Sequence, residues 1–135
     1  MMYLPDTDTL NYLLKKREPA VTHLKNVTRR GAGMVLSAFV HFEVTRYLKL
    51  KGAAKLLREY RTMTADWDFA ILAEDGWDLA ADLWALRHSQ GRPIEDADLL
   101  IAATARQVGA VLVTNNVSHY DLLGVTLENW AVNGS

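Results

Sequence analysis

Cysteine is absent from the 135-residue sequence, which excludes disulfide bonds, thiolate catalysis and zinc sites built on cysteine. No apolar run approaches the roughly 20 residues that would cross a bilayer, so no membrane span is expected. The N-terminal residues lack a basic stretch followed by an apolar one, so a secretory signal is not expected either. Repeats, low-complexity tracts and linkers are missing as well. Together these absences predict a single cytoplasmic domain over residues 1–135.

An excess of positive charge is also lacking. Lys and Arg number 15 against 16 Asp and Glu, and this balance counts against a protein that is basic overall, as many nucleic-acid binders are. Basic residues gather locally at residues 15–17, 29–30 and along 49–61, where solvated helix faces are the simplest explanation. The histidines show no zinc-binding spacing, and neither a glycine-rich phosphate loop nor a G-x-S-x-G turn occurs.

The hydrophobic pattern alternates between short strands and helices. It predicts strands at residues 2–4, 34–36, 67–72, 110–114 and 124–130, and helices at residues 7–16, 38–51, 53–63, 74–89 and 99–108. Ser37 is the expected N-cap of helix 38–51 and Gly52 its expected end. The four tryptophans are expected mainly in the core and at its rim. This order predicts an α/β fold with a central, mostly parallel sheet flanked by helices on both faces.

In such sheets, ligands bind outside the carboxyl ends of the strands, where Asp6 and residues 114–116 are expected to lie. Asp98 is the least expected acid near them, because it begins a helix whose next turn carries Ile101 and Ala102. The alternative is an acid favoured by the helix dipole, and this explanation is sufficient for Asp96.

Glu43 raises the same question in helix 38–51. Its neighbours one turn away are Phe39, Val40 and Tyr47, so the carboxylate lies on an apolar ridge. The alternative is an ion pair with Arg46 at i+3.

Asp6 directly follows the first predicted strand and precedes Thr7 and Asp8, either of which could cap the next helix. If Asp6, Glu43 and Asp98 meet, two carboxylates about 4 Å apart would repel by about 4 kcal/mol at an effective dielectric of 20. No lysine or arginine stands at the predicted strand ends. A hard divalent cation, Mg²⁺ or Mn²⁺, with oxygen ligands is therefore the simpler solution.

The order of these motifs resembles the PIN-domain ribonucleases, most closely the VapC-type toxins of toxin–antitoxin pairs. The motifs are YLPDTD, VLSAFVHFEV, GRPIEDADLLIAATA and VLVTNN. Together with the segment that follows VLVTNN, the resemblance covers residues 3–130. The resemblance implies that Asp6, Glu43 and Asp98 are the first three acidic ligands. Pro5 and His41 depart from the usual pattern without touching this set.

The fourth acid is left open by the resemblance. Many members carry Asp shortly after the VT, where this chain has Asn115 and Asn116. Asp121 or Asp96 could take its place, and Thr114 matches a hydroxyl residue that helps to order the site.

The resemblance implies an endoribonuclease that uses one or two Mg²⁺ or Mn²⁺ ions to hydrolyse RNA, such as an exposed tRNA loop, leaving a 5′-phosphate. It also implies a homodimer inhibited by a cognate antitoxin, with contacts expected in residues 38–61. Two alternatives remain. A non-catalytic PIN scaffold would bind RNA or protein with the same fold. A phosphoacceptor receiver domain would need a lysine after a late strand, and VLVTNN has none.

Overall fold

The computed structural model describes residues 1–133, which form five strands, six α-helices and one 3₁₀ helix. The elements are β1 Met2–Pro5, α1 Thr7–Leu14, α2 Ala20–Arg29, β2 Gly33–Ser37, α3 Ala38–Leu50, α4 Ala54–Thr64, β3 Asp68–Ala70, α5 Glu74–Ser89, α6 Asp96–Val108, β4 Val111–Val113, η1 Val117–Tyr120 and β5 Leu127–Glu128. Within these residues, no helix combines the length and the apolar character needed to span a membrane.

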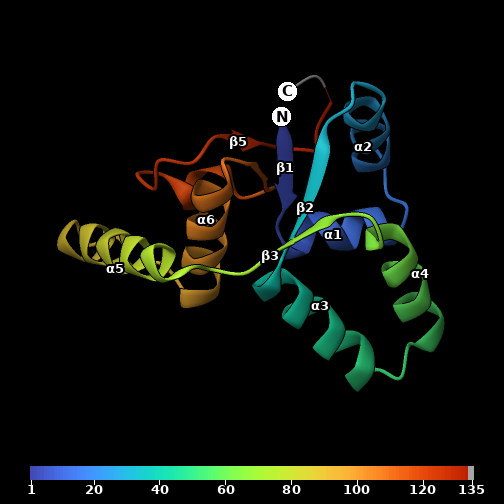
Figure 1. The fold of residues 1–135 in the computed structure, drawn as a ribbon, viewed down its shortest axis with the longest axis horizontal. Coiled ribbons are helices and arrows are strands. Elements are labelled where there is room, and N and C mark those ends of the chain that lie inside the picture. The colour runs from blue at the N-terminus through green and yellow to red at the C-terminus, as the bar shows by residue number, and fades with distance from the viewer. Residues whose placement is uncertain (134–135) are drawn as a thin grey trace.

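The sheet has the strand order β3-β2-β1-β4-β5, and every pairing in it is parallel. The chain moves outward from β1 to β3 and then returns across the sheet to β4. Because crossovers between parallel strands are right-handed, the two directions place their helices on opposite faces. Figure 1 shows this division, with α5 and α6 on one side of the sheet and α1 to α4 on the other. The predicted α/β fold is confirmed, and the sheet is wholly parallel.

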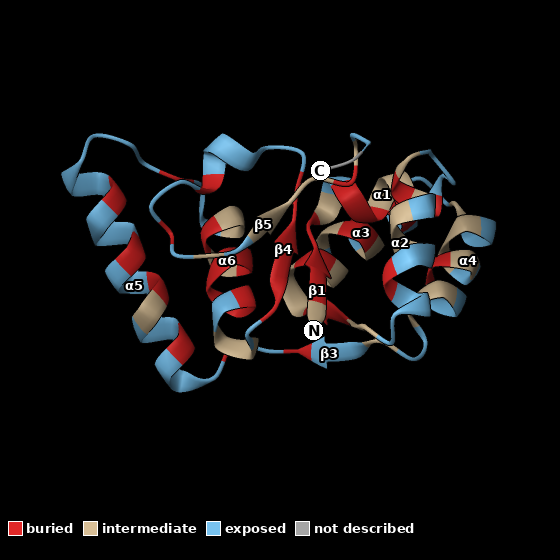
Figure 2. Cartoon of the chain, turned by 90° about the horizontal axis from the view of Figure 1, so that it is seen from above, coloured by how far each residue is buried: buried red, intermediate tan, exposed pale blue. Residues whose placement is uncertain are grey.

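The central strands are buried on both faces, as expected for a parallel sheet covered by helices. Leu4 in β1 and Leu112 and Val113 in β4 are fully buried, and Figure 2 shows buried residues along the middle of the molecule. The N-terminus and α1 lie at opposite edges in Figure 2, so the carboxyl ends of the strands meet at the edge where α1 begins.

Local signals set several of the helix ends. Ser37 is the N-cap of α3, as predicted, and its hydroxyl accepts a hydrogen bond of 3.1 Å from the backbone N–H of Phe39. Gly109 ends α6 in the left-handed conformation, with φ 70°, which favours glycine. Helix α5 begins and ends at the predicted residues.

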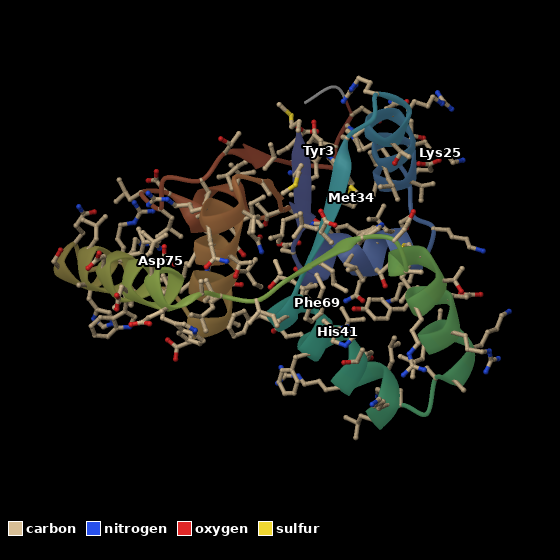
Figure 3. All side chains as sticks on the ribbon, in the orientation of Figure 1. Tyr3, Lys25, Met34, His41, Phe69 and Asp75 are labelled. Atoms are coloured by element: carbon tan, nitrogen blue, oxygen red, sulfur yellow. The ribbon has the colours of Figure 1, made fainter. Side chains whose placement is uncertain are left out.

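Several predictions about elements were wrong. Helix α2 was missed, and the last strand is Leu127–Glu128 instead of residues 124–130. Strand β3 is also shorter than predicted, and the alternating residues Phe69 and Ile71 are 52% and 68% exposed. They face outward because β3 is an edge strand. Figure 3 shows Phe69 beside His41 of α3, with ring centroids 5.5 Å apart.

The tryptophans divide into two groups. Trp130 is fully buried and Trp67 is partly buried against the core, as predicted. Trp77 and Trp84 on α5 are 50% and 44% exposed, so they lie at the rim of the core and not inside it. Both line a groove between α5 and α6 together with Leu99 and Leu100.

Candidate active site

A cavity of about 200 Å³ opens at the carboxyl edge of the sheet. Its lining consists of Asp6, Thr7, Asp8, Glu43, Asp98, Asn116, His119 and Tyr120. The three acids predicted to meet therefore share one pocket, although they come from the end of β1, from α3 and from α6. The lining contains neither lysine nor arginine. We call this cavity the acidic pocket.

Asp6 is buried at the end of β1 and is itself the N-cap of α1. Its Oδ1 accepts a hydrogen bond of 2.9 Å from the backbone N–H of Thr9. Burial raises the pKa of Asp6, and hydrogen bonds with Thr9 and Thr114 offset part of that rise. The cap that sequence analysis assigned to Thr7 or Asp8 therefore belongs to Asp6, whose ionised form is costly to bury in this place.

Glu43 lies in the second turn of α3 and turns toward the start of α1. Its Oε1 accepts a hydrogen bond of 2.6 Å from the hydroxyl of Thr7. Its Oε2 lies 3.9 Å from Nη2 of Arg46, so the ion pair considered from the sequence is present. The pair is long and the Arg46 side chain is 59% exposed, so it neutralises Glu43 only weakly.

Asp98 is held by two residues that sequence analysis did not assign to the site. Tyr120 donates a hydrogen bond of 3.2 Å to Oδ1, and Nε2 of His119 lies 3.0 Å from Oδ2. Burial and the negative charges of Asp98 and Asp6 raise the pKa of Tyr120, so its hydroxyl stays a donor. Their position just after the predicted strand 110–114 was the only sequence signal for these residues.

The segment that carries His119 and Tyr120 is fastened by Arg87 of α5. Arg87 is buried, and its guanidinium donates to the backbone oxygens of Arg92 (2.7 Å), His119 (3.0 Å) and Asp121 (3.0 Å). A buried guanidinium that donates to three carbonyls holds this turn against α5. Sequence analysis missed Arg87 because nothing local marks its partners, the most distant of which is 34 residues away along the chain.

Thr114 and Asn116 lie at the end of β4, where they were expected. Thr114 is buried, it hydrogen-bonds with Asp6, and its hydroxyl accepts a hydrogen bond of 3.0 Å from the backbone N–H of Asn116. Asn116 lines the acidic pocket. Thr114 thus orders both the first acid and the loop that follows β4.

The structure places Asp96 and Asp121 outside the acidic pocket. Asp96 opens α6 and borders a groove between α5 and α6 instead. Asp121 is exposed, and its Oδ2 lies 2.9 Å from Nη1 of Arg92. The hydrogen bond from Arg92 holds the pKa of Asp121 below its usual value. Neither residue lines the pocket, where the fourth carboxylate is that of Asp8, an exposed residue in the first turn of α1.

The acids share a pocket but do not form a ready ligand cage. Within residues 1–133, no three histidine, aspartate or glutamate side chains stand together in an arrangement that could hold one ion. Each carboxylate is turned to a protein partner, such as Thr7 for Glu43 and Tyr120 for Asp98. The chemistry of the donors still fits a hard cation, because the pocket offers carboxylate oxygens and no arginine or lysine in its lining.

Comparisons with known proteins support the same fold. The PIN domain matches residues 3–122. Among solved structures, the chain is similar to VapBC2 from Rickettsia felis bound to a promoter DNA fragment, with 22% identity and a TM-score of 0.87 over 96% of this chain and 99% of that one. It is also similar to VapBC-1 from nontypeable Haemophilus influenzae, with 25% identity and a TM-score of 0.76 over 98% and 100%.

DNA-bound VapBC from Salmonella typhimurium is a third similar structure, with 22% identity and a TM-score of 0.82 over 96% of this chain and 98% of that one. A comparison with curated protein sequences found no match. The PIN match covers most of the chain and includes all four acidic residues that line the pocket, so this chain belongs to the PIN-domain family.

Proposed function

We propose that this chain is a Mg²⁺- or Mn²⁺-dependent endoribonuclease that acts as the toxin of a toxin–antitoxin pair. The observation that carries the proposal is the acidic pocket, where Asp6, Glu43 and Asp98 from three separate elements meet with no arginine or lysine in the lining. Carboxylate oxygens are the ligands that Mg²⁺ and Mn²⁺ prefer, and this preference supports the proposal.

In this proposal, Asp6, Glu43 and Asp98 would hold the metal. The metal would make a water molecule nucleophilic and would stabilise negative charge on the scissile phosphate. The protein's part is orientation. Thr9 and Thr114 fix Asp6, and Thr7 fixes Glu43. The pocket opens to solvent between α1, α3 and α6, so a strand of RNA, such as a tRNA loop, could present one phosphate to it. Hydrolysis would leave a 5′-phosphate.

His119 and Tyr120 would control the direction in which Asp98 points. Both hold Asp98 through side-chain contacts, and both are positioned by the turn that Arg87 fastens. The hydroxyl of Tyr120 is a permanent donor at neutral pH, since its pKa lies above the usual value. A fixed donor on Oδ1 leaves the other carboxylate oxygen for a ligand once His119 moves aside.

The toxin role is supported by the similar structures, which are VapBC complexes and FitAB bound to DNA. We therefore propose a cognate antitoxin and a second copy of this chain as protein partners, in a cytoplasmic location. Phe42 and Tyr47 on α3, within the region 38–61 named from the sequence, are 59% and 55% exposed. Large exposed apolar side chains of this kind are common where a protein partner binds.

The alternative is a PIN scaffold that binds RNA or protein without cleaving it. The weak pairing of the acids with arginine disfavours this alternative, because a purely structural pocket would be better served by neutral side chains or strong ion pairs. A cleavage assay distinguishes the nuclease from the non-cleaving scaffold.

The test is cleavage of single-stranded RNA by the purified protein, with the 5′ end of each product identified. We expect EDTA to stop cleavage and Mg²⁺ or Mn²⁺ to restore it. Asp98→Asn should lower the rate by more than about 100-fold, because even the outer partners of a metal ligand are worth roughly 10–100-fold. Asp96→Asn is the matched control, since it changes an acid of the same helix turn outside the pocket.

Cleavage that persists in EDTA would remove the metal from the mechanism. An Asp96→Asn variant as inactive as Asp98→Asn would show that charge at the helix start matters, and not the pocket itself. Absence of cleavage by the parent protein on every RNA tried, with intact RNA binding, would support the scaffold alternative.

A further inference from the structure

A second cavity begins one residue away from the acidic pocket. It has a volume of about 290 Å³, and its lining consists of Tyr12, Arg17, Glu18, Ala20, Asn115 and Ala131. Asn115 borders this cavity, and the next residue, Asn116, borders the acidic pocket. The two cavities therefore border the same loop, the one that follows β4. We call the second one the flanking cavity.

Arg17 provides the flanking cavity with an available positive charge. Its side chain is exposed, and its guanidinium carbon lies 4.8 Å from the centre of the Tyr12 ring. Within residues 1–133, no carboxylate lies within 4 Å of this guanidinium. Tyr12 is half-buried, so its ring is held while one face carries Arg17. This layered pair offers both a flat surface and a cation.

The neighbouring acid does not cancel this charge. The carboxylate of Glu18 accepts hydrogen bonds from the backbone N–H of Thr22 (2.9 Å) and from its hydroxyl (3.0 Å). These bonds hold Glu18 against the first turn of α2. Asn115 adds an exposed amide, whose Oδ1 accepts a hydrogen bond of 3.3 Å from Asn129. An amide carries both donor and acceptor capacity for the edge of a base.

The two cavities are complementary in charge. The acidic pocket attracts a metal but repels a phosphate backbone, so an RNA substrate needs a cationic contact close by. Arg17 is the cation that lines the cavity adjoining the pocket. Guanidinium planes and aromatic rings also stack on unpaired bases, and such stacking serves every base.

We propose that the flanking cavity binds a nucleotide next to the scissile phosphate of single-stranded RNA. The base stacks on the Tyr12–Arg17 layer, the guanidinium of Arg17 contacts the adjoining phosphate, and the amide of Asn115 hydrogen-bonds with the base edge. Binding of an unstacked base in this cavity would select loops over duplexes. This inference depends on the nuclease proposal for its substrate class.

The test measures RNA affinity apart from cleavage. The protein carries Asp98→Asn in every arm, and a fluorescein-labelled short unstructured RNA is titrated in Ca²⁺ buffer over a range of salt concentrations. Tyr12→Leu should weaken binding by at least about 5-fold, the lower end of the loss measured for stacking residues. Tyr12→Phe keeps the ring and should bind like the parent. Circular dichroism checks that each variant is folded.

Arg17→Gln should weaken binding and reduce the slope of log K against log salt by about 0.7, the value for one phosphate contact on a single strand. Arg29→Gln, a change of the same charge at the exposed end of α2, is the matched control and should change neither. Equal effects of Arg17→Gln and Arg29→Gln, or full affinity in Tyr12→Leu, would overturn the proposal that the flanking cavity binds RNA.

Failure of the nuclease proposal has a different signature. It would appear as absence of metal-dependent cleavage by the parent protein, whatever the affinity results are. If the parent cleaves RNA and the Tyr12 and Arg17 variants keep full affinity, only the flanking cavity is rejected. If the parent binds RNA through Tyr12 and Arg17 but never cleaves it, the cavity stands and the nuclease proposal falls.

Discussion

The acidic pocket and the outer surface of β3 and α5 break the usual distribution of side chains in opposite ways. The pocket gathers carboxylates, one of them buried, with no lysine or arginine in its lining. The outer surface exposes Phe69, Ile71, Trp77 and Trp84, each by at least 44%. We call these four residues the apolar surface. Figure 3 labels Phe69 in β3 and Asp75 in α5, the element that follows β3 along the chain.

The two regions differ in how the chain manages the cost. In the pocket, Asp6, Glu43 and Asp98 have internal partners, such as Thr9 for Asp6 and Thr7 for Glu43. The apolar surface has few internal contacts, among them the edge-to-face packing of Trp77 on Phe39 at 6.0 Å. A buried charge must be satisfied within the fold. An exposed apolar residue lowers the stability of the isolated chain only slightly, so it can remain exposed until a partner binds.

The largest expected effect in this comparison is at Asp6. Asp6→Asn keeps the N-cap of α1 but removes the buried charge, so cleavage should be lost and the metal-free protein should become more stable by about 0.5–2 kcal/mol. Burial raises the pKa of Asp6 from 3.8, so the stability that its protonation supports is present below 3.8 and is lost as pH rises through the folded pKa. Thermal unfolding of parent and variant against pH measures this.

In that experiment the unfolding temperature of the parent, measured relative to that of Asp6→Asn, should fall as pH rises above 3.8. Mg²⁺ at about 100 times its dissociation constant should stabilise the parent by ~2.7 kcal/mol and the variant by less. A variant less stable than the parent at neutral pH without metal would show that the ionised Asp6 carboxylate does not destabilise the folded protein. The pocket would then carry no energetic cost to compare with that of the apolar surface.

A smaller effect on cleavage is expected at Arg87, which connects α5 to the turn that carries His119 and Tyr120. Arg87→Met fills similar space but leaves three carbonyl oxygens without their donor, so unfolding should become easier by about 1–3 kcal/mol. Cleavage should fall as the turn that carries His119 and Tyr120 loosens. Urea unfolding and single-turnover rates measure the two effects.

Asp121→Asn is the matched control for Arg87, because it acts on the same turn from the solvent side. It removes the surface pair with Arg92 and leaves the clamp of Arg87 in place. Stability and cleavage should both stay at parent values. Inactivity of Asp121→Asn would bring back the fourth acid that the structure places outside the pocket.

The smallest effect on stability is expected at the apolar surface. Phe69→Ser and Trp84→Ser should each cost less than the about 3–5 kcal/mol of truncating a fully buried aromatic residue, because both side chains are about half exposed. Their effect should be on association instead. Analytical ultracentrifugation of the parent should show self-association that these variants weaken. A monomeric parent would mean that the surface has no partner of its own kind.

Sequence patterns located most of this fold because strong hydrophobic periodicity survives any tertiary context. Helix α5 and the N-cap Ser37 were predicted correctly. Helix α2 was missed because only Ala20 and Val27 of its residues are buried, which leaves a weak apolar stripe. Strand β3 was predicted, but its period-two pattern indicates only that one face is apolar, and not whether anything covers that face.

The site was predictable to the extent that it rests on regular elements. Asp6 follows a strand and Glu43 and Asp98 lie on helices, so strand ends and helical spacing were enough to suggest that they approach each other. His119 and Tyr120 lie on a short 3₁₀ helix, whose position depends on a guanidinium from another element. No periodicity carries that information.

The sequence by itself determined the strand and helix order, the apolar ridge beneath Asp98 and the absence of cysteine chemistry, because these depend on neighbours along the chain. Only the tertiary structure decided that Asp98 enters the pocket with His119 and Tyr120 while Asp121 turns to Arg92 and solvent. The physical reason is that loop direction is set by a few distant hydrogen bonds, such as those of Arg87, whose partners become neighbours only when the chain has folded.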